Sequence, residues 1–66
     1  MNDEIRAALI LRYRAAMAEA EANIQVYLRH PAGIGEHSDI VGAVDEQIEK
    51  AAAASEKLDY ISGLRY

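Results

Sequence analysis

The 66-residue sequence contains no cysteine, no phenylalanine and no tryptophan, and it has one proline and four glycines. Without cysteine, the chain can form neither a disulfide nor a thiolate metal site. The lack of cysteine also fits a reducing compartment, so we expect a cytoplasmic protein. Four tyrosines are the only aromatic residues, and much of the 52% hydrophobic content is alanine. This composition favours closely packed helices over a thick aromatic core.

Long hydrophobic runs are also missing. No apolar stretch approaches the roughly 18 residues of a membrane span, and the first residues, Met-Asn-Asp-Glu, are acidic, whereas a secretory signal begins with positive charge. We therefore expect no membrane association. A chain this short buries only about 60% of its unfolded surface, and small folds of this kind usually need a disulfide, a metal or a partner chain.

The first half of the chain has helical spacing throughout. Asn2 is a good N-cap, and Asp3 and Glu4 place negative charge at the positive end of the helix dipole. Because the residue before a proline avoids the α region, Pro31 predicts a helix over about 3–29. Its apolar residues recur in steps of three and four, at Ile5, Leu9, Tyr13, Ala16, Ala20, Ile24 and Tyr27.

A short loop over 30–38 follows, with Gly33 and Gly35 suited to reversing the chain. We expect Ser38 to be the N-cap of a second helix over about 39–62 and Gly63 to be its C-cap. From Val41 to Leu58 the apolar positions form a heptad-like seam. The full expected stripe contains Ile40, Val41, Val44, Ile48, Ala51, Ser55, Leu58 and Ile61.

The short loop makes the two helices antiparallel neighbours. We therefore predict an all-α fold, a single helical-hairpin domain over 1–66. Two helices cannot enclose a core, so we expect a homodimer in which two hairpins form a four-helix bundle. The apolar stripe of the first helix is wider than one neighbour needs. The predicted oligomer interface comprises Leu9, Ile10, Tyr13, Met17, Ile24, Val44, Ile48 and Leu58.

Residues with reactive or metal-ligating side chains gather in the loop but lack a recognised spacing. Glu36, His37 and Asp39, with His30 nearby, show neither HxxxH nor HxxE helical spacing. The Gly33-Ile34-Gly35 segment follows a helix and has no P-loop lysine, so it favours a turn over a nucleotide site. We expect no metal, no cofactor and no enzymatic activity, because a hairpin with alanine-rich interfaces offers no obvious cleft. The loop remains a candidate recognition loop through Ile34, Glu36 and His37.

Charge is distributed unevenly along the chain. Residues 1–30 carry four arginines and four acids, whereas residues 31–66 carry three basic and seven acidic side chains, a net charge of −4. An acidic half disfavours phosphate binding, and Arg6, Arg12 and Arg14 are spread around their helix, so we do not expect a nucleic-acid partner. The first hypothesis is a small, non-enzymatic, self-associating protein with a structural or protein-interaction role. The alternative is an acidic inhibitor or decoy that binds a basic host protein.

The segment from Ile24 through the loop to Ile40, together with Asp45–Lys50 and Glu56–Leu58, resembles short uncharacterised proteins of tailed bacteriophages, including marine phages. The resemblance covers roughly residues 20–60, and the loop is its most specific part. It implies a compact helical hairpin made in the cytoplasm of an infected bacterium. It implies no activity, and it transfers no functional residues to this chain.

Overall fold

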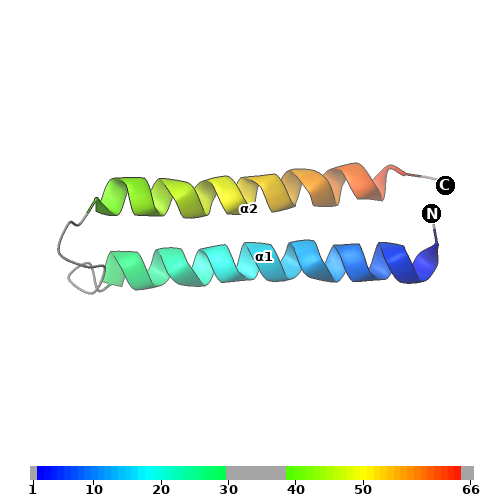
Figure 1. Ribbon diagram of the computed structural model, residues 1–66, viewed down its shortest axis with the longest axis horizontal. Helices are drawn as coiled ribbons and strands as arrows, with labels where there is room; N and C mark the ends of the chain where they lie inside the picture. The colour runs from blue at the N-terminus through cyan, green and yellow to red at the C-terminus, as the bar shows by residue number, and fades with distance from the viewer. Residues whose placement is uncertain (1, 30–38, 65–66) are drawn as a thin grey trace.

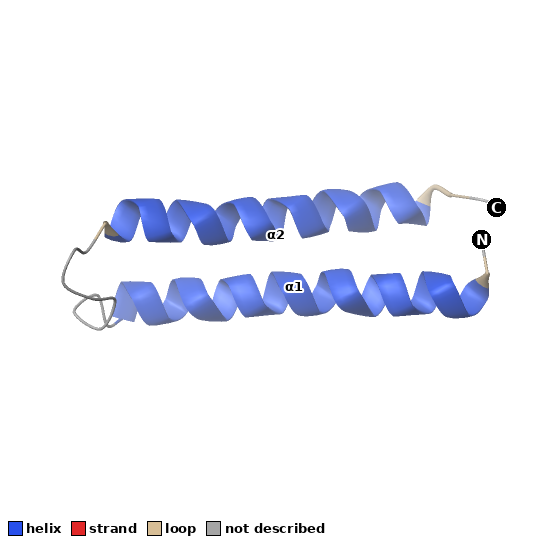
Figure 2. Ribbon diagram, viewed as in Figure 1, coloured by secondary structure: helices blue, strands red, loops and turns tan. Residues whose placement is uncertain are grey.

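The chain folds as two antiparallel helices (Figure 1). The computed structural model describes residues 2–29 and 39–64. Helix α1 spans Asp3–Arg29 and helix α2 spans Ile40–Ser62, where the sequence predicts helices over about 3–29 and 39–62. The molecule is a rod of 48 × 15 × 14 Å, and the start of α1 lies at the same end as the end of α2 (Figure 1). The predicted all-α hairpin is confirmed for the described residues, all of whose regular structure is helical (Figure 2).

Asn2 begins α1 as the sequence predicts. Its side-chain Oδ1 accepts hydrogen bonds from the backbone N–H of Glu4 at 2.7 Å and of Ile5 at 3.3 Å. These bonds satisfy two of the four N–H groups that have no partner inside the helix. Asp3 and Glu4 lie in the first turn and Arg29 lies in the last turn, so charges of both signs match the helix dipole.

The start of α2 differs from the prediction. The N-cap is Asp39, whose Oδ1 accepts a hydrogen bond from Gly42 N–H at 2.9 Å, whereas the sequence favoured Ser38, which lies outside the described residues. Asp39 can cap the helix because Gly42 has no side chain. A Cβ on Gly42 would lie 2.2 Å from Asp39 Oδ2. The glycine in the first turn therefore leaves room for the capping carboxylate.

The end of α2 agrees with the prediction. Gly63 is the C-cap, with φ −89° and ψ −10°. Its N–H donates to Tyr60 O at 3.1 Å, and Leu64 N–H donates to Ile61 O at 3.2 Å. Each of these bonds joins residues three positions apart instead of four, and it satisfies a carbonyl that lacks a partner in the last turn of the helix. Because Gly63 stays in the right-handed region, the chain leaves the helix without a left-handed turn.

The helices pack along one line of residues on each, which we call the seam. On both helices the seam residues are separated by alternating steps of four and three, the spacing of a coiled-coil repeat. They are buried or half-buried. On α1 they are Arg6, Ile10, Tyr13, Met17, Ala20, Ile24 and Tyr27; on α2 they are Ile40, Val44, Gln47, Ala51, Ala54, Leu58 and Ile61.

From Val41 to Leu58, the predicted stripe of α2 consists of two columns, each a set of residues spaced seven apart, and one of the two columns was wrong. Val41 is 80% exposed and Ile48 is 50% exposed, and Ser55 is also exposed, whereas Gln47 and Ala54 are buried. Both columns fit a heptad together with the remaining seam residues, so spacing alone does not separate them. The buried column also contains Ile40 and Ile61, and the polar side chain of Gln47 finds a partner on α1. On α1 the prediction placed Ile5 in the stripe, but Ile5 is 55% exposed and Arg6 takes the seam position.

Few side chains are fully withdrawn from solvent. Among the described residues, the buried hydrophobic ones are Ala20, Ala54 and Ile61, and no large side chain falls below 2% exposure. Alanines from both helices meet at the middle of the rod, where Ala16, Ala20, Ala53 and Ala54 line one hollow. The alanine-rich stretches of the two helices, residues 15–22 and 51–54, therefore lie side by side. The hairpin is therefore held by a thin contact in which most of the larger seam residues keep part of their surface in water.

The Asp39 cap leads to a testable prediction about Gly42. Replacing a glycine by alanine within a helix normally gains up to about 1 kcal/mol, but here the new Cβ displaces the Asp39 carboxylate and removes a cap worth about 1 kcal/mol. We expect Gly42→Ala to change the free energy of unfolding by less than about 0.5 kcal/mol. In an Asp39→Ala background the same change should stabilise by about 1 kcal/mol. Denaturant unfolding measures both, and equal gains in the two backgrounds would contradict the account.

Candidate interaction surfaces

Arg6 joins the beginning of α1 to the end of α2. Its Nη1 donates to Ile61 O at 2.6 Å and its Nη2 donates to Leu64 O. A charged guanidinium that bonds the last carbonyls of a helix also interacts favourably with the negative end of the helix dipole. The side chain is half-buried, so it is protected in part from competing water. Arg6 therefore holds the open end of the hairpin together.

A second polar contact lies toward the other end of the rod. Asn23 Nδ2 donates to Gln47 Oε1 at 3.1 Å, and Gln47 is only 6% exposed. A buried polar residue in a mainly apolar helix contact fixes how the two helices align, at some cost in stability. Shifting α2 along α1 would leave the Gln47 amide buried without this partner, which is unfavourable. The pair therefore specifies the register of the hairpin.

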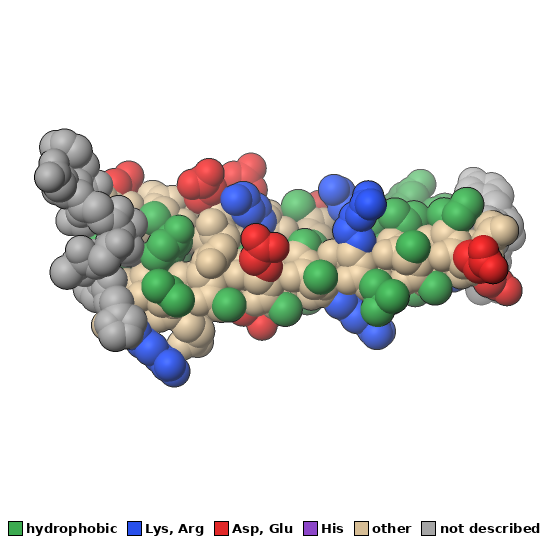
Figure 3. Space-filling model, turned by 60° about the horizontal axis from the view of Figure 1, so that its bottom comes forward, with side chains coloured by type: hydrophobic (Ala, Val, Ile, Leu, Met, Phe, Trp, Pro, Cys, Tyr) green, Lys and Arg blue, Asp and Glu red, His purple; other side chains and the backbone are tan. Residues whose placement is uncertain are grey.

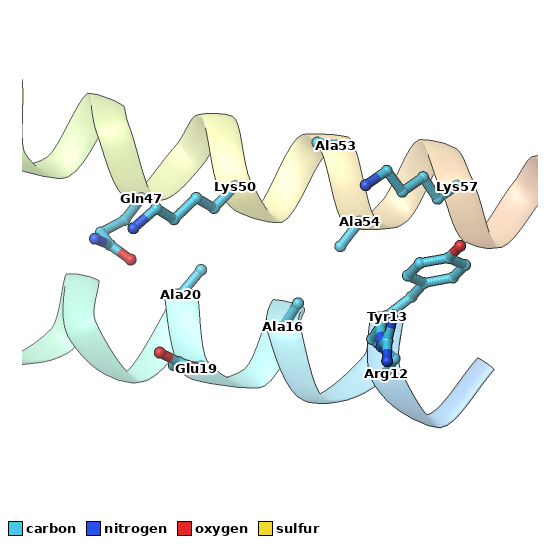
Figure 4. Close-up of a pocket in the computed structure, with 10 residues that line it drawn as sticks. All are labelled: Arg12, Tyr13, Ala16, Glu19, Ala20, Gln47, Lys50, Ala53, Ala54 and Lys57. Atoms are coloured by element: carbon cyan, nitrogen blue, oxygen red, sulfur yellow. The ribbon is translucent and has the colours of Figure 1, made fainter. Parts of the chain in front are cut away.

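The alanines at the middle of the rod leave a hollow on one flank of the seam (Figure 4). Its volume is about 340 Å³, and Ala16, Ala20, Gln47 and Ala54 lie between the two helices in it. Its charged residues are Arg12, Glu19, Lys50 and Lys57. Its lining contains no histidine, serine or cysteine.

A second hollow of about 370 Å³ continues from the first toward the open end of the hairpin. The two share Tyr13 and Lys57, and Lys57 Nζ lies 5.8 Å from the centre of the Tyr13 ring, within the range of a cation–π contact. The remaining lining residues are Leu9, Glu56, Tyr60, Ile61 and Leu64. Together the two hollows form a shallow, mostly apolar groove along this flank.

An apolar patch lies near the end of the rod where α1 finishes and α2 begins. Leu28, Val41 and Ile48 are 63%, 80% and 50% exposed. They line a third hollow of about 330 Å³ with Ile40, Val44 and Asp45. Exposed apolar surface of this kind marks contact sites more often than scattered single residues do.

The structure divides the eight residues of the predicted oligomer interface into two groups, those at the seam and those on the exposed surface. Seven of them are half-buried in or beside the seam between α1 and α2 and so first serve the hairpin itself: Leu9, Ile10, Tyr13, Met17, Ile24, Val44 and Leu58. Ile48 points away from the seam and is half exposed. The candidate recognition loop, Ile34, Glu36 and His37, lies outside the described residues, as does the whole of the predicted loop over 30–38.

Sequence reasoning missed the two polar contacts of the seam. It considered Arg6 together with Arg12 and Arg14 only as arginines spread around their helix, but Arg6 bonds the end of α2 while Arg12 and Arg14 are exposed. It passed over Asn23 and Gln47 because both are polar. A signal existed for two of these residues. Gln47 continues a strict 4–3 repeat between Val44 and Ala51, and Arg6 lies one step before Ile10 at the start of such a repeat.

Among residues 2–29 and 39–64, no three histidine, cysteine or acidic side chains are grouped so as to hold a metal ion. Neither α1 nor α2, as described here, combines the length and the apolar character needed to cross a membrane.

The contacts of Arg6 predict a loss of stability on its replacement. Arg6→Gln should lower the free energy of unfolding by about 1–3 kcal/mol, because it removes charge-assisted bonds to carbonyls at a helix end. Lys50→Gln is the matched control: it also removes one positive charge, but from an exposed side chain, and should cost less than about 0.5 kcal/mol. Both are measured by denaturant unfolding. Equal losses in the two variants would mean that net charge, rather than the bonds to Ile61 and Leu64, explains the effect.

The burial of Gln47 predicts a pH-dependent variant. Gln47→Glu keeps the shape but places a carboxylate in a site that is 6% exposed, where desolvation raises the pKa of the new carboxyl above the roughly 4.3 of a free Glu. The protonated acid is tolerated and the charged one is not. The variant should therefore match the parent below about pH 4, then lose about 1–3 kcal/mol relative to it as the pH rises toward 7. Thermal melts of both proteins across this range measure the difference, and a constant difference would contradict the prediction.

Comparison with protein-family models, with curated proteins and with solved structures finds no match to this chain. The resemblance to tailed-phage proteins therefore stays a prediction. What the protein does must be argued from the hairpin's own surfaces.

Proposed function

We propose that this chain is a small, non-enzymatic helical protein that self-associates and has a structural or protein-interaction role. In the proposed assembly, two hairpins combine as a four-helix bundle. The observation that carries the proposal is the large amount of apolar surface that the hairpin leaves in water. Seven large hydrophobic side chains are at least half exposed: Ile5, Leu11, Val26, Leu28, Val41, Ile48 and Tyr60.

Scattered exposed hydrophobic residues are normal in a soluble protein, but here they coincide with a very thin core. The described part of the chain contains no large side chain below 2% exposure. A hairpin of this kind has little burial to offset the conformational entropy lost on folding. Association adds burial that the single hairpin lacks, and by mass action it stabilises the folded form. Self-association therefore explains how so small a chain without a disulfide can be stable.

The mass in solution tests the proposal. Light scattering on a sizing column should give a multiple of 7.3 kDa, most simply twice that mass, and dilution should lower it toward the monomer. The melting temperature should rise with protein concentration, because only the folded form associates. A stable, folded species of 7.3 kDa at all concentrations from micromolar upward would overturn the proposal.

The outer side of α2 supports a second function, the acidic inhibitor or decoy. Asp45, Glu46, Glu49, Glu56 and Asp59 are all exposed, and they lie away from the seam. A row of carboxylates on one helix fits a basic partner surface. Such docking must weaken as salt rises, so binding to a basic protein that is indifferent to salt would exclude this role.

A further inference from the structure

We propose that the outer face of α1 is the self-association surface, and that it pairs antiparallel with the same face of a second copy. This inference rests on the proposed self-association and specifies where it occurs. The outer face is the side of α1 turned away from α2. Its central residues are all exposed and are Glu4, Ala8, Leu11, Ala15, Ala18, Ala22, Gln25 and Arg29.

These central residues repeat the spacing of the seam. They follow one another in alternating steps of four and three, so α1 carries two lines with coiled-coil spacing, of which α2 covers only one. Ala15, Ala18 and Ala22 are small enough to let another helix approach at the short end of the 8–10 Å range. Figure 3 looks at the molecule from the α1 side and shows apolar side chains along its length, with acidic and basic groups beside them.

Three of the four large exposed hydrophobic residues of α1 belong to this face alone. Leu11 lies on the central line and is 66% exposed. Ile5 and Val26 lie on one edge, each more than half exposed. The fourth, Leu28, lies at the other edge but also lines the hollow that it shares with α2.

The charges on the two edges identify the occupant. Arg12 and Glu19 lie on one edge, and Arg14 and Glu21 lie on the other. Within each edge the two residues are seven apart, so they are too far along the helix to pair with each other at the usual spacing of three or four. Each edge thus presents a positive group toward one end and a negative group toward the other. This pattern is complementary to itself after a two-fold rotation.

In a single register, an antiparallel second copy pairs the central residues of the two faces, with opposed charges at the ends and alanines at the middle. With the two-fold axis between Ala16 and Met17, Ala15 faces Ala18 of the second copy and Leu11 faces Ala22 of the second copy. At the two ends Glu4 faces Arg29. The contacts repeat on the other side of the axis, because a two-fold interface uses the same surface of both copies.

The edges match in the same register. In antiparallel coiled coils, residues on equivalent edges face each other. Arg12 then meets Glu19 of the second copy on one edge, and Arg14 meets Glu21 on the other, which gives four opposed pairs across the interface. The apolar ends of the edges also meet, with Ile5 beside Val26 and Ala7 beside Leu28.

The net charges of the two helices favour this arrangement over contact through α2. Residues Asp3–Arg29 carry four basic and four acidic side chains and are neutral, whereas Ile40–Ser62 with its Asp39 cap carries two lysines and six acids, a net charge of −4. Contact through α1 places the neutral helices at the centre and the two acidic helices at the outside, as far apart as the assembly allows. Contact through α2 would bring like charges together, which is costly.

Charge reversal on the edges tests the pairing. Two double variants are made, R12E/R14E and E19R/E21R, together with R12E/R14E/E19R/E21R, which carries both sets. Each double variant puts like charges opposite each other at four places, so its self-dissociation constant should rise at least about 100-fold. The fourfold variant has the composition of the parent and restores opposite charges at every place. It should self-associate like the parent.

An equal mixture of the two double variants gives an independent readout. In that mixture every glutamate edge of one chain meets an arginine edge of the other, so a heterodimer should form although neither variant associates alone. The control is D45R/D59R, which changes the net charge by the same amount as E19R/E21R but on exposed positions of α2. Its mass in solution should equal that of the parent. Circular dichroism at high concentration confirms that each variant is helical.

The outcomes separate the inference from the proposed function. A parent protein that is a monomer overturns both. A parent that associates, with double variants that associate equally well, leaves self-association standing and overturns the α1 interface in favour of the second hollow or the Leu28, Val41 and Ile48 patch, neither of which contains a substituted residue. The α1 interface is also overturned if the double variants dissociate and neither the fourfold variant nor the mixture restores association. In that case the loss of association does not result from like charges facing each other across the interface. Dissociation with both rescues is the result that we expect.

Discussion

A pair of helices can bury only one line of side chains on each member, and the rest of this structure depends on that limit. The seam between α1 and α2 has the spacing of a coiled coil, but each seam residue faces a single neighbouring helix and most of the larger ones keep part of their surface in water. Burial contributes roughly in proportion to the apolar area removed from water. A thin seam therefore supplies little stabilisation for each residue ordered, and specific polar contacts between the helices add to it.

The two polar contacts act on different parts of this problem. Arg6 bonds the Ile61 and Leu64 carbonyls at the end of α2, and so it ties together two ends that are far apart in sequence. The Asn23–Gln47 pair lies inside the contact and selects one alignment of the helices. Alanine-rich seams need such a device, because alanines interlock weakly and slide past one another at small cost. The end contact resists separation, and the internal contact resists sliding.

Much of the fold could be predicted from the sequence, because its signals are local. Asn2, the step pattern and Gly63 bound the helices within a few neighbouring residues. The column of α2 that faces α1 could not be predicted in the same way, since Val44, Ala51 and Leu58 fit both choices and only the partner helix distinguishes Gln47 from Ile48. Arg6 reaches a carbonyl 55 positions away, and no local pattern reports such a contact. The predicted interface residues were apolar and correctly spaced, but the first partner that they meet is the other helix of the same chain.

The pattern of α1 is the strongest argument that the hairpin is not the final assembly. A helix that packs on one neighbour needs one apolar line and tolerates any soluble arrangement on its other side. The outer side of α1 instead carries a second line with coiled-coil spacing, alanines at its middle, and charges whose order reverses about the midpoint of the helix. Arginines that served only solubility would have no reason to precede a glutamate by seven residues on both edges, Arg12 before Glu19 and Arg14 before Glu21. A two-fold contact requires this arrangement, since each group must meet its complement after the helix is turned end for end.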